Sequence, residues 1–217
     1  KSESRYKVTG NFLVTGKDGK KSEFKAEVPD YFESSKEAKD FLESCKTSEF
    51  LVESIEKKPA KKSPSPPFTT STLQQEASRK LRFSVSRTML VAQKLYEAGK
   101  ITYMRTDSVN LSEIALNAAE QQIKNEYGKN YSHRRQFKTK SKTAQEAHEA
   151  IRPTDFGNES ISGSRDEKVL YELIWKRALA SQMSDAQLER TTLKINVSKA
   201  DKLFVAKGEV IKFDGFL

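Results

Sequence analysis

Hydrophobic side chains follow two different spacings along this chain. Close to the N-terminus they alternate with polar residues, first over residues 6–14 and then over residues 24–28, with the turn signal TGKDGKK between them. Alternation with a period of two is typical of strands, and the Asp-Gly pair predicts a β-hairpin. The same alternation returns over residues 193–197 and in KLFVAKGEVIKF. Strands are therefore predicted at both ends of the chain.

Between these ends the spacing becomes helical, with hydrophobic residues recurring every three or four positions. Ser86 is the predicted N-cap and Gly99 the predicted stop of one helix, and another is predicted from Ser112 to Gly128. Pro153 is predicted to end a further helical stretch. The segments with this spacing are TTSTLQQEASRKLRF, SRTMLVAQKLYEAG, LSEIALNAAEQQIKNEYG, TAQEAHEAIRP and DEKVLYELIWKRALASQM.

Two further elements and a proline-rich stretch separate the hairpin from this helical middle. SSKEAKDFLESC predicts a short helix capped by Ser34 or Ser35, and FLVESIEKK predicts a strand. The following stretch KPAKKSPSPPF, residues 58–68, contains four prolines. Because proline disfavours both helix interiors and central strands, residues 58–68 are predicted to be a linker between domains.

The pattern as a whole predicts an α+β fold in which a helical domain is inserted into a discontinuous β-rich domain. The β-rich domain is expected over residues 1–64 and again over 188–217, and the helical domain over 65–187. The chain starts at Lys1 without a methionine and stops at Leu217 within a strand-like pattern. We therefore expect it to be an internal piece of a larger protein.

Composition narrows the class of protein. With 35% hydrophobic and 32% charged residues and no apolar run of membrane-spanning length, a soluble globular chain is expected. A single cysteine, Cys45, excludes an internal disulfide framework. One cysteine and two histidines also cannot build a zinc site alone.

The positive charge is concentrated in one part of the chain. The net charge is +9, and residues 57–105 hold eleven Lys or Arg against two acidic residues, Glu76 and Glu97. Such an excess suits a polyanion such as nucleic acid, although a solvated lysine face is the common alternative. The excess ends on the stretch YEAGKITYMRTDSVN, residues 96–110, which favours the first interpretation.

That stretch carries the first candidate for chemistry. In the extended piece after Gly99, side chains alternate in direction, so Tyr103 and Arg105 are expected on one side and Met104 on the other. A guanidinium beside a phenol offers a bidentate contact for a phosphate next to an oxygen nucleophile. A free phenol has a pKa of about 10 and needs help to attack. The alternative is a structural tyrosine.

Two further groups could contact an anion. On a helical turn His148 and Arg152 would share a face, although a surface or capping histidine is the alternative, and His133 is expected to be structural. In PPFTTSTLQQEASRKL, hydroxyls at a helix start precede Arg79, Lys80 and Arg82, which could hold backbone phosphates. Plain N-capping by residues 70–72 explains the hydroxyls equally well.

Three long motifs in this order and spacing resemble the type IA DNA topoisomerases, and bacterial topoisomerase I in particular: PFTTSTLQQEASRKL, QKLYEAGKITYMRTDSVNLS and QEAHEAIRPTD. The strong resemblance spans about residues 64–190, and the flanking strands fit the family loosely. In topoisomerase III the residue at the Met104 position is usually proline.

The resemblance implies a role for each matching residue. Tyr103 would form a transient 5′-phosphotyrosine link with one DNA strand, Arg105 would bind the scissile phosphate, and His148 would contact it as a donor. Thr102, Thr106, Asp107 and Ser108 would position the loop or the strand. The expected DNA-binding residues are Thr72, Gln75, Arg79, Arg82, Thr102, Thr106, Asp107, Ser108 and Arg152.

The resemblance also implies an ATP-independent, cytoplasmic isomerase of the bacterial nucleoid. It would relax negatively supercoiled DNA by single-strand cleavage, strand passage through a gate and religation, with DNA and the rest of its own polypeptide as partners. In this family an acidic Toprim domain binds Mg²⁺, and no such pattern occurs in these 217 residues. This piece alone is therefore expected to bind single-stranded DNA weakly and not to cleave it.

Two kinds of alternative remain open at the level of sequence. One is a non-catalytic single-stranded-DNA-binding module, in which basic and aromatic side chains bind the strand. The other is the equivalent part of topoisomerase III or of reverse gyrase, which share the gate.

Overall fold

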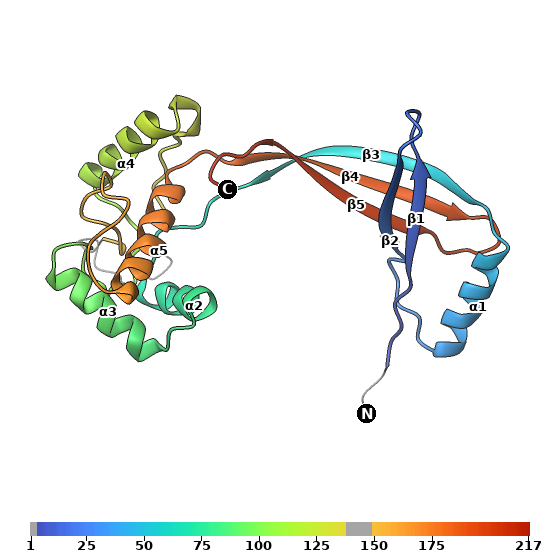
Figure 1. The fold of residues 1–217 in the computed structure, drawn as a ribbon, viewed down its shortest axis with the longest axis horizontal. Coiled ribbons are helices and arrows are strands. Elements are labelled where there is room, and N and C mark those ends of the chain that lie inside the picture. The colour runs from blue at the N-terminus through green and yellow to red at the C-terminus, as the bar shows by residue number, and fades with distance from the viewer. Residues whose placement is uncertain (1–3, 138–148) are drawn as a thin grey trace. The chain divides into compact units, whose positions relative to one another are not determined.

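The computed structural model describes residues 4–137 and 149–217, which form five strands and five α-helices in two compact units (Figure 1). One unit contains residues 1–60 and 187–212, and the other contains residues 61–186 and 213–217. The first unit is mostly sheet and the second mostly helix. The prediction of an α+β fold is confirmed.

The first unit is built on a five-stranded sheet in the order β1-β2-β5-β4-β3. Strands β1 (Thr9–Thr15) and β2 (Lys21–Glu27) form the predicted antiparallel hairpin. Helix α1 (Ser35–Lys46) follows and begins where the Ser34 hydroxyl accepts a hydrogen bond from the backbone N–H of Glu37. Strands β4 (Ala186–Val197) and β5 (Phe204–Phe213) complete the sheet. A small core gathers the phenylalanines Phe32, Phe41 and Phe204.

Strand β3 (Phe50–Lys62) is longer than its sequence suggested. The predicted linker at residues 58–68 is wrong for residues 58–62, which continue this strand. The strand contains Pro59 but lies at the edge of the sheet. An edge strand tolerates proline because its backbone N–H groups on the open side need no partner in the sheet.

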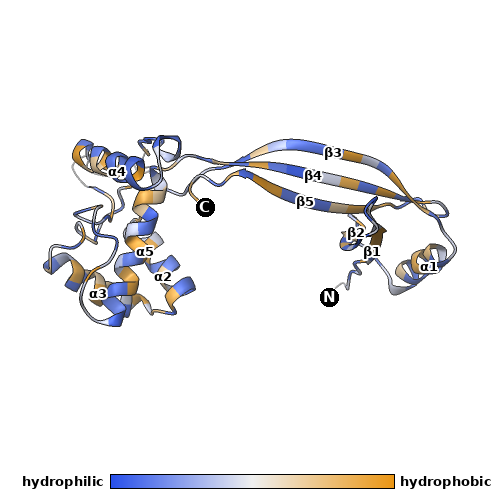
Figure 2. Ribbon diagram, turned by 45° about the horizontal axis from the view of Figure 1, so that its top comes forward, coloured by the Kyte–Doolittle hydropathy of each residue, from blue (hydrophilic) through white to orange (hydrophobic). Residues whose placement is uncertain are grey.

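The second unit gathers helices α2 (Thr70–Leu81), α3 (Val85–Glu97), α4 (Glu113–Glu126) and α5 (Arg165–Ser181), with a short 3₁₀ helix η1 (Lys129–Tyr131). Helix α5 contacts both α2 and α3. Figure 2 shows hydrophobic and hydrophilic residues interspersed along these helices, as expected for helices that are buried on one side.

Side-chain hydroxyls cap the start of each α-helix in this unit. Ser112 caps α4 as predicted, and Thr69 and Ser164 cap α2 and α5 within reciprocal capping boxes. The predicted cap of α3 is wrong. The hydroxyl of Ser84, not Ser86, accepts from the N–H of Arg87, so this helix starts two residues earlier.

The core of this unit forms around α5. Leu170, Ile174 and Ala178 are fully buried, and the indole N–H of Trp175 donates to the carbonyl of Phe156 at 2.9 Å. Tyr171 is 1% exposed, and burial raises the pKa of its hydroxyl to about 12. Within the described ranges, none of the helices is both long and apolar enough to cross a membrane.

Extended segments cross this helical unit and pair with one another. Phe68 pairs with Ile151, and Ile101 pairs with Pro153, both in antiparallel bridges. The helical turn predicted through Arg152 is therefore wrong for residues 149–153, which are extended. The reason is tertiary: these residues complete backbone pairs with two segments far away in the sequence. The predicted site residue His148 lies outside the described residues.

Candidate active site around Tyr103

The segment that carries Tyr103 begins at a sharp helix stop. Gly99 has a φ of +68°, which an L side chain rarely adopts. Its N–H donates to the carbonyl of Tyr96 at 2.8 Å, and the next N–H, of Lys100, donates to the carbonyl of Leu95 at 2.8 Å. These two bonds form a Schellman motif, which turns the chain back after α3.

Beyond this turn the side chains alternate between core and surface. Tyr103 is 45% exposed and Arg105 is exposed, whereas Met104 between them is 1% exposed. This alternation is the one that the extended stretch predicts. The phenol and the guanidinium can therefore both meet a ligand from solvent.

A threonine hydroxyl fixes the backbone directly before Tyr103. The hydroxyl of Thr102 donates to the carbonyl of Ala150 at 2.7 Å and accepts from the N–H of Arg152 at 3.0 Å. The N–H of Thr102 donates in turn to the carbonyl of Arg152 at 2.9 Å. Thr102 is thus bound to residues 150–152, nearly fifty positions away, rather than left free to contact a ligand.

A second threonine fixes the backbone directly after Tyr103. The hydroxyl of Thr70, the first residue of α2, donates to the carbonyl of Met104 at 2.7 Å and accepts from the N–H of Thr106 at 2.9 Å. The N–H of Thr70 donates to the carbonyl of Thr106, also at 2.9 Å. The position of Tyr103 is therefore held on both sides.

The residues that follow form a tight polar turn. The Thr106 hydroxyl accepts from the N–H of Ser108, and the Ser108 hydroxyl accepts from the N–H of Asn110, both at 3.1 Å. Ser108 is 2% exposed, so its side chain faces the protein. Asp107 is exposed.

Arg152 is bound to the protein itself. Its side chain is 13% exposed and forms two hydrogen bonds with the carboxylate of Glu149, at 2.7 and 3.3 Å. The same carboxylate accepts from the N–H of Ser112 at 2.7 Å, just before α4. Burial raises the pKa of Glu149, but hydrogen bonds from Arg152 and Ser112 lower this pKa by more, so the net shift is downward.

Tyr96 contacts the side chain of Tyr103. The two ring centroids are 5.3 Å apart and the ring planes meet at 68°, an edge-to-face arrangement. Tyr96 lies in the last turn of α3 and is 41% exposed. The two exposed rings therefore contact each other at the surface of the helical unit.

Helix α2 carries the other predicted DNA-binding residues. Thr72 completes the capping box with Thr69, and Gln75 is exposed one turn later. The carboxylate of Glu76 accepts two 2.9 Å hydrogen bonds from Arg79 and a 3.0 Å ion pair from Lys80. Arg82 ends the helix with a left-handed backbone and is exposed.

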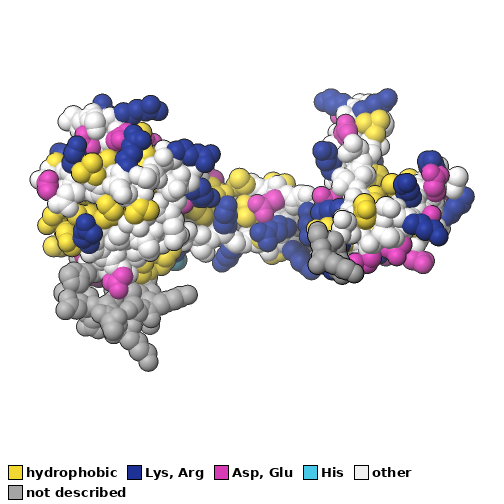
Figure 3. All heavy atoms as spheres, turned by 90° about the horizontal axis from the view of Figure 1, so that it is seen from below, with side chains coloured by type: hydrophobic (Ala, Val, Ile, Leu, Met, Phe, Trp, Pro, Cys, Tyr) yellow, Lys and Arg dark blue, Asp and Glu magenta, His cyan; other side chains and the backbone are white. Residues whose placement is uncertain are grey.

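A third cation reaches Glu76 from α5. The guanidinium of Arg177 lies 3.4 Å from the Glu76 carboxylate and 4.2 Å above the ring of Phe68. Burial raises the pKa of Glu76, but hydrogen bonds from Arg79 and Lys80 lower this pKa by more, so the net shift is downward. Basic side chains are not confined to the cluster around Glu76. Figure 3 shows Lys and Arg side chains spread over both units, among acidic and hydrophobic side chains.

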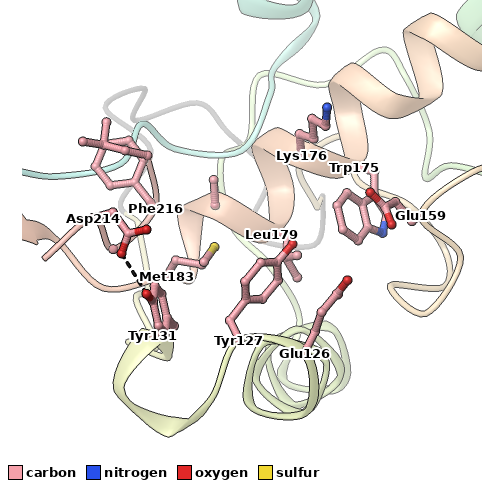
Figure 4. A pocket seen from close by; sticks show the side chains of 13 residues that line it. Glu126, Tyr127, Tyr131, Glu159, Trp175, Lys176, Leu179, Met183, Asp214 and Phe216 are labelled. Carbon is pink, nitrogen blue, oxygen red and sulfur yellow. Dashed lines mark hydrogen bonds between the residues drawn. The ribbon is translucent and has the colours of Figure 1, made fainter.

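Among the described residues, neither a metal-binding cluster nor the pocket beside α5 coincides with Tyr103. Within residues 4–137 and 149–217, no three His, Cys, Asp or Glu side chains gather to hold a metal ion. A pocket of about 640 Å³ lies between α4, α5 and residues 214–217, where the Tyr131 hydroxyl donates to Asp214 at 2.8 Å (Figure 4). This pocket contains none of the predicted site residues, and we assign it no part in the chemistry.

Three residues of this site were missed from the sequence alone. Thr70 was attributed to plain capping. Glu149 binds the N–H of Ser112, which is far away in the sequence, and Tyr103 lies beyond the end of the helix that carries Tyr96. The one signal in the sequence for Tyr96 was its position seven residues before Tyr103 across a glycine stop. No local pattern could have indicated the distant backbone partners of Thr70.

Comparison with known proteins gives a consistent result. A sequence profile of the family described as DNA topoisomerase matches residues 1–217. DNA topoisomerase 1 of Zymomonas mobilis is 54% identical over 170 residues, which cover 77% of this chain and 14% of that protein. DNA topoisomerase 1 of Synechococcus elongatus is 51% identical over 189 residues, which cover 83% of this chain and 21% of that protein. The chain thus spans about a fifth or less of the length of these curated relatives.

Solved structures include a similar fold. Full-length topoisomerase I from Thermotoga maritima matches 98% of this chain with a TM-score of 0.77 and 33% sequence identity, and the match covers 36% of that chain. The similarity therefore extends over both compact units of this chain, each of which has its counterpart in the longer protein.

Proposed function

The chain belongs to the bacterial DNA topoisomerase I family, and from this membership we propose that it supplies the strand-cleaving tyrosine of a type IA topoisomerase. The whole protein would relax negatively supercoiled DNA by cutting one strand, passing another through the gap and resealing the cut. The observation that carries this proposal is an exposed Tyr103 beside an exposed Arg105 on a backbone held at both flanks.

The proposed chemistry is a reversible transfer of a phosphoryl group. The Tyr103 oxygen attacks the phosphorus of one DNA phosphodiester, a phosphorus–oxygen bond to tyrosine forms, and the bond to the 3′ oxygen breaks. The phenol loses its proton and the departing 3′ oxygen gains one, which leaves a free 3′ hydroxyl and a 5′-phosphotyrosine. Religation is the reverse reaction. Arg105 would stabilise the charge that develops on the phosphate oxygens, and His148 would add a second donor.

The remaining predicted site residues divide into two proposed groups. Thr72, Gln75, Arg79, Arg82 and Asp107 are at or near the surface and would contact or orient the DNA strand. Thr102, Thr106, Ser108 and Arg152 form hydrogen bonds within the protein. We propose that this second group acts by placing the backbone that carries Tyr103.

The same proposal covers the domains and the metal. We keep the domain bounds 1–64, 65–187 and 188–217, with the helical domain inserted into the β-rich one. The acidic side chains of the described residues do not fit a Mg²⁺ site, so the metal-binding residues of the family are expected elsewhere in a longer protein. On this proposal the 217-residue chain binds single-stranded DNA weakly and does not cleave it alone.

A covalent adduct tests the proposed function. The longer protein that carries this segment is incubated with Mg²⁺ and a single-stranded oligonucleotide labelled at its 3′ end, and adducts are trapped by denaturation. The label should migrate with the protein, and the Tyr103→Phe variant should form no adduct and relax no supercoiled plasmid. Relaxation that survives this substitution overturns the proposal. Binding without any adduct would favour a non-catalytic single-stranded-DNA-binding module.

A further inference from the structure

We propose that Tyr96 is a positioning residue for Tyr103, holding the phenol ring of the nucleophile through an edge-to-face contact. This inference rests on the proposed function, because it matters only if Tyr103 attacks a phosphate. Nothing in the reaction requires a second tyrosine, so the argument comes from the geometry of the pair.

The backbone of Tyr103 is fixed, but its side chain is not. Thr102 and Thr70 bind the backbone on either side, and the Met104 side chain is buried in the core. The Tyr103 ring points to the surface and is 45% exposed. Within residues 4–137 and 149–217 its hydroxyl has no hydrogen-bond partner. An exposed aromatic ring with a fixed backbone can still occupy several χ1 rotamers.

The ring of Tyr96 restricts this freedom. Its centroid lies 5.3 Å from that of Tyr103 at 68°, within the favourable range for an edge-to-face pair. Tyr96 itself is anchored in the last turn of α3. The Schellman motif at Gly99 returns the chain toward this last turn, so the local fold places the two rings together.

The consequence for catalysis is a higher fraction of Tyr103 in one rotamer. Attack on phosphorus requires the nucleophilic oxygen to lie in line with the leaving group. A Tyr103 ring that is spread over several rotamers therefore lowers the rate of DNA cleavage. The contribution of such an aromatic pair corresponds to a factor of about two to ten in population. The ring of Tyr96 is needed for this contact, and its hydroxyl is not.

The test compares two substitutions in the longer protein. Single-turnover cleavage of a 3′-labelled single-stranded oligonucleotide is measured with Mg²⁺ for the unmodified protein, Tyr96→Phe and Tyr96→Ala, together with the dissociation constant for the oligonucleotide. Tyr96→Phe should cleave at the unmodified rate. Tyr96→Ala should cleave about two- to tenfold more slowly with an unchanged dissociation constant. Tyr31→Ala, which changes an exposed tyrosine of the other unit, is the control and should change neither value.

Each other outcome is decisive. An unmodified rate for Tyr96→Ala overturns the positioning role, and so does a Tyr96→Phe variant as slow as Tyr96→Ala, which would point to the hydroxyl. A higher dissociation constant for Tyr96→Ala with an unchanged cleavage rate would make Tyr96 a DNA contact instead. Absence of any adduct in the unmodified protein overturns the proposed function itself, so the two failures are distinguishable.

Discussion

The hydroxyl of Thr70 donates a 2.7 Å hydrogen bond to the backbone carbonyl of Met104, thirty-four residues further along the chain. The same oxygen accepts from the N–H of Thr106. One side chain at the start of α2 therefore satisfies a donor and an acceptor of the segment that carries Tyr103. Helix start and candidate nucleophile form one structural piece.

Replacing Thr70 by valine should destabilise the protein. Valine keeps the shape of threonine but leaves the Met104 carbonyl and the Thr106 N–H without this partner. We expect a loss of about 1–3 kcal/mol in the free energy of unfolding, measured by urea denaturation. Thr70→Ser keeps the hydroxyl and should recover most of the loss. Equal stability of the valine and serine variants would show that these bonds do not matter.

Replacing Gly99 by alanine should loosen the end of α3. The φ of +68° is costly for an L residue, so we expect a loss of about 1 kcal/mol or more in the free energy of unfolding. Gly208→Ala is the control, because an added methyl group at Gly208 meets open space and its φ lies outside the left-handed range. Thermal denaturation should separate the two variants. Similar melting temperatures would count against strain at Gly99.

Replacing Glu149 by glutamine should change how stability depends on pH. Hydrogen bonds from Arg152 and Ser112 outweigh burial and hold the folded pKa of Glu149 below its ordinary value of 4.5. A lowered folded pKa contributes stability above the unfolded pKa, and this stability is lost as the pH falls through the folded pKa.

The expected result is a difference in stability between the unmodified protein and Glu149→Gln that depends on pH. Glu149→Gln should be less stable than the unmodified protein at pH 7, and the gap should shrink as the pH falls below about 4.5. Melting temperatures between pH 3 and pH 7 measure it. Glu172→Gln, which removes an exposed pair with Lys176, is the control and should give a small gap. A constant gap for Glu149→Gln would exclude the carboxylate as its source.

Replacing Glu76 by glutamine should leave three cations without their shared carboxylate. Arg177 is the most buried of these, and burial lowers its pKa while Glu76 raises it. We expect a loss of about 1–3 kcal/mol in the free energy of unfolding, larger at low ionic strength, where repulsion is less screened. Glu43→Gln, in an exposed pair with Lys46, should stay within about 0.5 kcal/mol. Equal effects would argue against a structural role for the cluster.

Local signals predicted most of the fold correctly. The Asp-Gly hairpin, the Ser112 cap and the stop at Gly99 depend on residues close in sequence, and the structure contains all three. Pro59 was misinterpreted because its tolerance depends on the edge position of β3, which only the strand order reveals. The cap of α3 was misplaced because two serines, Ser84 and Ser86, stand at almost equivalent positions.

The site was less accessible to sequence reasoning. Alternation correctly separated Tyr103 and Arg105 from the buried Met104, since it needs only a short extended stretch. The segment 149–153 looked helical, but its bridges to Phe68 and Ile101 keep it extended. Glu149, three residues before Arg152, was a visible candidate for an ion pair, but its second bond, to the N–H of Ser112, depends on a contact far away in the sequence.

For the proposed function, the two threonine hydroxyls would have a mechanical consequence in strand passage. Thr70 and Thr102 join three stretches of backbone that are remote in sequence, so the backbone of Tyr103 is not free to move independently of them. A displacement large enough to separate the ends of a cut strand must carry α2 and residues 149–153 along with the tyrosine. A DNA end bonded to Tyr103 would then move together with the helical unit. Motion of a flexible loop alone would not displace it.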